Sequence, residues 1–142
     1  MSGEQTYEKF LPEGIPEWQR PFWESLREHA VRVQRCTRCG TYRYHPKEKC
    51  HRCPSRDAEW APVSGRGEIY TYTVIRRAPT PAYAPDVPYT IVHVTMVEGF
   101  RMVGTLEGID PDQVRIGLPV VLAYRDVTED WTLIGFRPGS GT

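Results

Sequence analysis

Four cysteines carry the clearest chemical signal in the chain. They form two Cys-x-x-Cys pairs, Cys36 with Cys39 and Cys50 with Cys53, separated by ten residues. Each pair can form a knuckle that places two sulfurs on one side of a tight turn, and two facing knuckles bring four thiolates to about 2.3 Å from one zinc ion. Gly40, directly after the first pair, suits the strained turn of such a knuckle. The spacing predicts a structural zinc site, because four sulfur ligands leave no open coordination position for catalysis.

Two disulfides and an iron centre are the alternatives for the same cysteines. Disulfides are rare in a reducing compartment, and residues 1–6 show neither the basic nor the apolar region of a secretory signal. The longest apolar run covers only residues 120–124, whereas a membrane-spanning helix needs about 20 residues. We therefore expect a cytoplasmic protein that holds zinc and does not enter a membrane. An iron-carrying, rubredoxin-like electron carrier stays an alternative, although it would not need the strands that follow.

Basic residues are concentrated around the cysteines. The 142 residues include 18 basic and 18 acidic side chains, and this zero net charge disfavours a nucleic-acid binder that is basic overall. Residues 27–66 have a net charge of +6, while residues 1–26 and 67–142 each have −3. Four thiolates around Zn²⁺ have a net charge of −2, which neighbouring cations offset. The remaining positive charge is available for an anionic ligand or a partner surface.

No group of residues in the sequence resembles a catalytic site. The motifs Gly-x-Ser-x-Gly and His-Glu-x-x-His and a glycine-rich phosphate loop do not occur. The carboxylates near predicted turns, such as Asp110 and Asp126, suit turn chemistry. The sequence therefore argues against an enzyme that acts on its own.

An aromatic helix is predicted before the cysteines. Residues 16–30 place apolar side chains along one helical face, with Pro21 near the start and His29 near the end. This face either caps the ribbon and the core or meets a partner or a fatty ligand. Its apolar residues are Trp18, Phe22, Trp23, Leu26 and Ala30.

Residues after Trp60 change to a period of two, which is typical of strands. We expect five strands, near residues 67–78, 89–97, 100–106, 120–125 and 131–136, with a tight turn at Glu98-Gly99. A helical turn beginning at Asp110 separates the third strand from the fourth, which is the element order of an OB-fold barrel. A loop with four prolines, residues 79–88, separates the first two strands.

The predicted fold class is mainly β, with an N-terminal helical segment, a rubredoxin-like zinc ribbon and a five-stranded OB-fold barrel. The expected boundaries are 1–31 for the N-terminal loop and helix, 32–62 for the ribbon and 63–138 for the barrel. Residues 139–142 are expected to form a disordered tail.

The order of these modules resembles the DUF35 family of acyl-CoA-associated proteins. The likeness covers about residues 16–138 and rests on several short motifs in order. The family's metal ligands fall on Cys36, Cys39, Cys50 and Cys53, and one departure is Pro54, where many ribbons have glycine. The motifs are Pro-Phe-Trp at 21–23, Cys-x-x-Cys-Gly at 36–40, Val-Pro-Tyr-Thr-Ile-Val-His-Val at 87–94, Val-Glu-Gly at 97–99, Ile-Gly-Leu-Pro-Val-Val-Leu at 116–122 and Phe-Arg-Pro at 136–138.

The resemblance implies a non-catalytic accessory subunit. Such proteins work beside thiolase-like enzymes, including aldolases of steroid side-chain breakdown, and some are fused or bound to MaoC-like enoyl-CoA hydratases. The implied role is to complete the partner enzyme and to help it bind or channel acyl-CoA. A dimeric partner would give a heterotetramer with two copies of each chain.

Two sets of residues are candidates for this role. Basic side chains would hold the phosphates of CoA, and an aromatic side chain of the proline-rich loop would cover its arm; these are Arg43, Lys47, Arg52, Arg76, Arg77 and Tyr83. Exposed aromatic and proline residues would contact the partner enzyme; these are Trp18, Phe22, Trp23, Pro81 and Tyr83.

A nucleic-acid-binding OB module with a structural zinc is the main alternative. Aromatic residues on its strands would stack on bases, and the candidates are Tyr70, Tyr72, Tyr89 and Phe100. The net charge of −3 over residues 67–142 opposes this function, because a groove that follows a phosphate backbone is positively charged.

Overall fold

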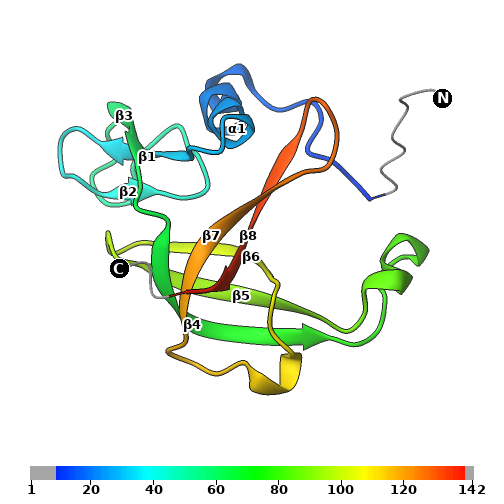
Figure 1. Ribbon diagram of the computed structural model, residues 1–142. Coiled ribbons are helices and arrows are strands. Elements are labelled where there is room, and N and C mark those ends of the chain that lie inside the picture. The colour runs from blue at the N-terminus through cyan, green and yellow to red at the C-terminus, as the bar shows by residue number, and fades with distance from the viewer. Residues whose placement is uncertain (1–8, 140–142) are drawn as a thin grey trace.

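The computed structural model describes residues 9–139, and its elements form a helix, a small sheet and a barrel (Figure 1). A 3₁₀ turn, η1 (Glu17–Gln19), leads into α1 (Arg20–Arg27). The small sheet contains β1 (Arg32–Cys36), β2 (Tyr42–Arg43) and β3 (Ala58–Pro62). The barrel contains β4 (Arg66–Ile75), β5 (Tyr89–Met96), β6 (Arg101–Leu106), β7 (Pro119–Asp126) and β8 (Thr132–Pro138), with the 3₁₀ turns η2 (Pro81–Asp86) and η3 (Pro111–Gln113) in its loops.

The barrel closes in the strand order β4-β5-β6-β8-β7. Only the β6–β8 pair is parallel among these strands, and β4 pairs with β7 to close the barrel. This arrangement and the helical turn between β6 and β7 confirm the predicted OB-fold. The alternation expected in β5 is also present, because Thr90, Val92, Val94 and Met96 all point into the core.

The first barrel strand is shorter than predicted. Ile75 pairs with Tyr89, the first residue of β5, so the residues after Ile75 have no partner across the sheet. The strand therefore ends there and leaves Arg76 and Arg77 exposed beyond it.

The N-terminal helix also ends earlier than predicted. It stops at Arg27, and His29 adopts a left-handed conformation with φ of 57° as the chain turns toward β1. Phe22 and Leu26, both 1% exposed, pack against Val31 and Val33 in a second core cluster. Burial of each such side chain contributes about 1.5–3 kcal/mol, which fixes the helix on the ribbon and barrel.

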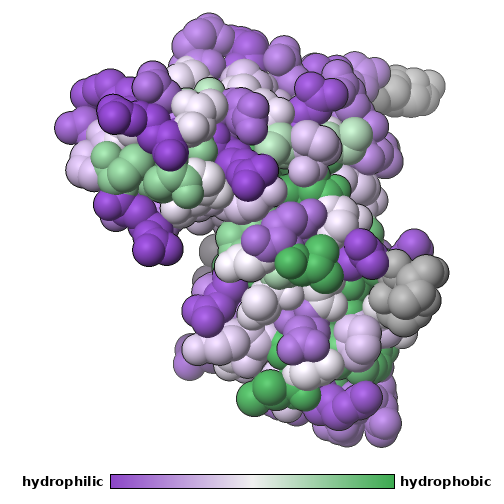
Figure 2. All heavy atoms as spheres, turned by 90° about the vertical axis from the view of Figure 1, so that its left-hand side faces the viewer, coloured by the Kyte–Doolittle hydropathy of each residue, from purple (hydrophilic) through white to green (hydrophobic). Residues whose placement is uncertain are grey.

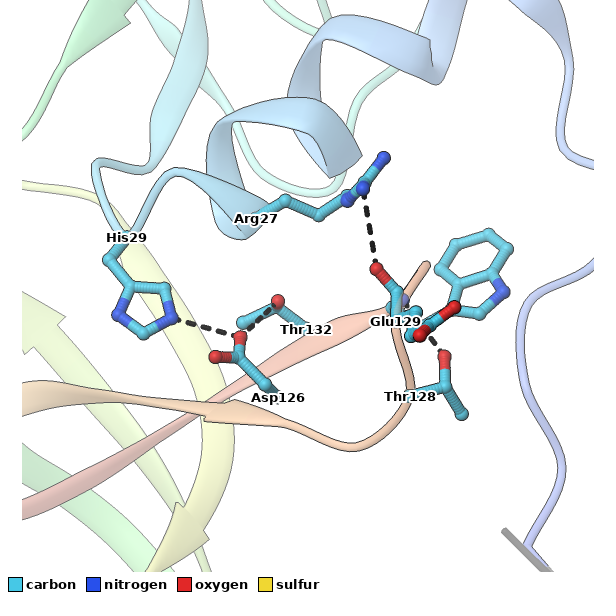
Figure 3. A network of polar contacts seen from close by, with 7 residues as sticks. Arg27, His29, Asp126, Thr128, Glu129 and Thr132 are labelled. Carbon is cyan, nitrogen blue, oxygen red and sulfur yellow. Dashed lines mark hydrogen bonds and ion pairs between the residues drawn. The ribbon is translucent and has the colours of Figure 1, made fainter. Parts of the chain in front are cut away.

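Polar contacts join the end of the helix to the β7–β8 hairpin (Figure 3). His29 Nε2 lies 2.9 Å from Asp126 Oδ1, and the Thr132 hydroxyl donates to the same oxygen at 2.5 Å. Arg27 Nη2 donates to the Glu129 carbonyl at 3.3 Å. Apolar packing and these polar contacts together hold α1 in place.

The ribbon-bearing lobe overhangs the barrel lobe on one side, and hydrophilic residues cover most of its visible surface (Figure 2). The Tyr42 ring of the ribbon stacks on Phe100 of the β5–β6 hairpin, with 4.9 Å between centroids. Between residues 9 and 139, no helix has the length and apolar character required to cross a membrane. The predicted disordered tail falls outside the described residues, apart from Gly139.

Candidate functional site

The four cysteine sulfurs form one compact cluster. All four lie within 4.8 Å of one another, and the Cys36–Cys53 and Cys39–Cys50 sulfurs are each 3.5 Å apart. A disulfide needs an S–S distance of about 2.05 Å, so these are free thiols. A tetrahedron with Zn–S bonds of about 2.3 Å has sulfurs about 3.8 Å apart. The cluster therefore has the donors and the size that suit a structural zinc ion.

The two knuckles share one backbone pattern. The Cys36 amide donates to the Thr41 carbonyl, and the Cys50 amide donates to the Ser55 carbonyl, both at 2.8 Å. Gly40 occupies the turn of the first knuckle with φ of 77°. Pro54 holds the corresponding position of the second knuckle, with φ of 25°.

Backbone amides and neighbouring sulfurs set the charge of the cluster. The Cys39 amide lowers the pKa of Cys36 to about 6, with a further contribution from the Arg38 amide. The Ser55 amide favours the Cys53 thiolate, but the Cys36 sulfur, desolvation by burial and the Cys39 and Cys50 sulfurs together outweigh it and raise the pKa of Cys53 to about 11. Four thiolates at this spacing repel one another, so their full ionisation requires a cation among them.

Arg43 holds the ribbon together from the inside. It is 1% exposed, and its guanidinium donates to the carbonyls of Lys47, Ser55 and Asp57 at 3.2, 3.0 and 3.2 Å. This corrects the expectation that Arg43 contacts CoA, because its charged group points into the ribbon and is not accessible to a phosphate. It fixes the loop around the second knuckle instead.

A cleft of about 840 Å³ separates the ribbon from the β5–β6 hairpin, and we call it the ribbon–barrel cleft. It contains Lys47 and Arg52 from the predicted set and adds Arg35 and Arg101, which the sequence analysis missed. Glu98 is the one carboxylate among its described lining residues. Arg35 is exposed between the buried Gln34 and Cys36, but Val33 and Gln34 are both buried, so a simple alternation along β1 does not predict its position. Basic side chains thus outnumber carboxylates along the cleft, which favours an anion there.

A smaller and more apolar hollow of about 320 Å³ lies between α1 and the barrel, and we call it the helix hollow. Three residues predicted for the partner interface line it: Phe22, Trp23 and Tyr83. Phe22 is 1% exposed, so it forms the floor of the hollow and offers no surface to a partner, which corrects that expectation. Its other lining residues come mainly from β5, β6 and β8.

The two openings adjoin, because Tyr44, His45 and Val103 line both. Burial and the nearby Lys47 lower the pKa of His45, which keeps its ring neutral at neutral pH. A basic cleft thus continues into an apolar hollow.

The remaining predicted residues lie outside this pair of openings. Arg76 and Arg77 follow β4 and lie at the end of the barrel away from the ribbon (Figure 1). Trp18 and Pro81 line neither opening. Tyr83 of η2, which lines the helix hollow, also stacks on Tyr89, with 5.6 Å between centroids.

The tyrosines of the nucleic-acid alternative lie partly on the outer surface of β4. Tyr70 and Tyr72 are 49% and 37% exposed. The Arg101 guanidinium lies 3.6 Å from the centre of the Tyr70 ring.

Comparison with known proteins matches both halves of the chain to described domains. Residues 23–59 match the rubredoxin-like zinc ribbon domain of ChsH2, and residues 60–125 match its C-terminal OB-fold domain.

Relatives of two kinds are similar to the chain. A DUF35 domain-containing scaffold protein of Methanocaldococcus jannaschii is 32% identical over 76% of this chain and 77% of its own length. A probable enoyl-CoA hydratase alpha subunit of Thermomonospora curvata is 38% identical over 82% of this chain. The chain spans only 36% of that subunit.

A solved structure has the same arrangement of modules. The chain named "Ltp2-ChsH2(DUF35) aldolase" aligns over 88% of this chain and 97% of its own length, with a TM-score of 0.79 and 35% identity. Together with the scaffold protein, this match shows that the chain belongs to the DUF35 family.

Proposed function

We propose that this protein is a non-catalytic accessory subunit of an acyl-CoA-processing complex. Its partner is a thiolase-like enzyme, either a thiolase or a retro-aldolase that cleaves an acyl-CoA, as in steroid side-chain degradation. The subunit helps to bind the acyl-CoA or to pass it between active sites. The observation that carries this proposal is the basic ribbon–barrel cleft that continues into the apolar helix hollow.

The two openings match the two ends of an acyl-CoA. Its phosphates would lie among the side chains of Lys47, Arg52, Arg35 and Arg101, where charge-assisted hydrogen bonds are strongest. The pantetheine arm would pass His45 and Val103, which line both openings. An apolar acyl group, or an apolar side chain of the partner, would fill the hollow beside Trp23.

The partner supplies the chemistry. His29 and Asp126 are the one histidine–carboxylate ion pair among residues 9–139, and they fasten the helix to the β7–β8 hairpin. Their position at this junction, outside both openings, is structural. We therefore assign the reacting groups to the thiolase-like enzyme.

A link to a hydratase is the second part of the proposal. A related sequence forms about a third of a hydratase alpha subunit, so the same module is joined there to a larger chain. In the present protein, a separate MaoC-like hydratase would take the place of that covalent connection. The complex with the thiolase-like enzyme would contain two copies of each chain.

Affinity purification of the tagged protein from its own cells tests the proposal. A thiolase-like enzyme recovered in equal amount supports it, and mass spectrometry then identifies the partner. Recovery of nucleic acid with ribosomal or replication proteins, and no such enzyme, would refute it. That result would favour the OB-fold nucleic-acid module.

A pair of variants then tests the surface. Trp23→Ala should weaken assembly with the purified partner, because it removes the aromatic wall of the hollow. Tyr72→Ala is the matched control, since Tyr72 is also partly exposed but lines neither opening. Equal assembly of both variants would exclude the hollow as the contact.

A further inference from the structure

A third cleft of about 600 Å³ shares no lining residue with the two openings above, and we call it the arginine cleft. Its basic residues come from four separate elements. His29 follows α1, Arg32 begins β1, Arg66 begins β4 and Arg137 lies in β8. No carboxylate occurs among its described lining residues.

The contacts around the cleft leave it rich in donors. Asp126 and Glu98 contact its lining residues, but Asp126 pairs with His29, and Glu98 accepts from the amide and the hydroxyl of Ser64. Within the part of the chain that the structure describes, the side chains of Arg32 and Arg137 have no ion-pair or hydrogen-bond partner. Two guanidinium groups thus face one cleft without a counter-ion.

A tyrosine hydroxyl adds a neutral donor. The Tyr124 oxygen accepts from the Val31 amide at 2.9 Å, and no described residue accepts its hydrogen. Burial raises the pKa of Tyr124, so the hydroxyl keeps this hydrogen at neutral pH.

Apolar side chains form much of the remaining wall. Val31 is 2% exposed, and Leu122 is partly buried in the adjoining core cluster. Walls of low polarity strengthen the field of nearby charges, because less water screens them.

We propose that the arginine cleft binds a phosphate-bearing ligand between the ribbon and the barrel. Arg32 supplies a guanidinium from the ribbon and Arg137 supplies one from the barrel, and each planar group can hold two phosphate oxygens. The bound phosphate connects two modules that the backbone links through residues 63–65. The site uses none of the residues assigned to acyl-CoA, so it can exist whether or not that function is correct.

Inorganic pyrophosphate is the probe for the first experiment. Isothermal titration of the full chain should show saturable binding that weakens as sodium chloride is added. In an amide NMR titration, the resonances of Ser64, Gly65 and Arg66 should shift with the same affinity. Binding that shifts only resonances near Lys47 and Arg52 would overturn the proposal, and so would the absence of saturable binding.

Matched substitutions locate the binding groups. Arg32→Gln and Arg137→Gln should each weaken pyrophosphate binding at least about fivefold, since each removes a charge-assisted contact. Arg115→Gln removes an exposed arginine outside all three openings and should bind as the wild type does. All three substituted side chains are exposed, so unchanged amide spectra away from the cleft will show that the variants fold. Unaltered affinity in both cleft variants would overturn the assignment.

Two competitors separate the sources of the ligand. If CoA displaces pyrophosphate from the arginine cleft, the phosphate belongs to CoA; if it does not, another phosphorylated molecule is the ligand, and both results support a phosphate site. A hexaglutamate peptide that binds where pyrophosphate does not would refute the proposal and indicate an acidic segment of a protein.

Discussion

Replacing Arg43 by Met tests how the ribbon holds its second knuckle. The substitution keeps an unbranched apolar stem but removes three hydrogen bonds, to the carbonyls of Lys47, Ser55 and Asp57. The Ser55 contact is buried and the other two are partly buried. We assign about 2 kcal/mol to the hydrogen bond with the Ser55 carbonyl and about 1 kcal/mol to each of the other two hydrogen bonds.

One opposing contribution reduces this sum. The Arg43 Nε atom is buried without a hydrogen-bond partner, and Met removes that unsatisfied donor. Removing this unsatisfied donor stabilises the fold by about 1 kcal/mol, so the free energy of unfolding should fall by about 3 kcal/mol in total. Such a loss is a large part of the 5–15 kcal/mol or so that separates a typical folded domain from its unfolded state.

Unfolding in guanidinium chloride with saturating zinc measures the loss in the free energy of unfolding. Competition with a coloured chelator measures how well each variant retains zinc. We expect a lower midpoint and faster zinc release for Arg43→Met. Arg52→Met is the control, because Arg52 is exposed and should change stability by no more than about 0.5 kcal/mol. Arg43→Lys keeps the charge but not the planar fork, so it should rescue only part of the loss.

Two results would refute the reasoning. If Arg43→Met is as stable as the Arg52→Met control and keeps zinc equally well, the three hydrogen bonds do not support the knuckle. If Arg43→Lys restores full stability, the positive charge near the thiolates matters and the geometry does not.

Three further predictions concern the metal, CoA and acid. Metal analysis should find one zinc per chain in a colourless protein, and chelation should broaden the amide resonances of the ribbon; a red protein containing iron would contradict this. Lys47→Glu combined with Arg52→Glu should weaken CoA binding about tenfold or more by calorimetry, whereas Arg76→Glu with Arg77→Glu should change it less than about twofold; the reverse order would move the phosphate site to the end of β4. Thr132 and then His29 lower the pKa of Asp126, so its contribution to stability is present above the pKa of the unfolded state, about 4, and is lost as the pH falls through the lower folded value. Asp126→Asn should therefore reduce the melting temperature at pH 6 more than at pH 2.5, and an equal reduction at both values would show that the charge is not involved.

Short-range patterns account for what the sequence could predict. The Cys-x-x-Cys pairs indicate the metal ligands because both sulfurs of a pair belong to one turn, and the structure brings all four within 4.8 Å. The alternation of β5 indicates its buried face because side chains of a strand point to opposite sides. Asp110 caps η3 as expected, since its side chain accepts from the Asp112 amide two residues away.

Residues of one type took different roles where packing decided. Phe22 and Trp23 are neighbours on the same helix, yet Phe22 is buried and Trp23 keeps part of its surface in the hollow. Arg43 and Arg52 both belong to the ribbon, but Arg43 faces the three carbonyls and Arg52 faces the cleft. The residue type and its place in the sequence pattern are compatible with both a buried and an exposed position. The sequence therefore could not tell which of these side chains would be buried.

The sequence alone determined the four-cysteine cluster, the strand faces and the order of the modules, because each depends on residues close together in the chain. The tertiary structure decided which distant side chains meet. His29 reaches Asp126 across 97 positions, and Lys47 of the ribbon shares a cleft with Arg101 of the barrel. These long-range contacts depend on how the barrel closes and on where the ribbon packs against it. Many contacts spread over the whole chain determine both of these features.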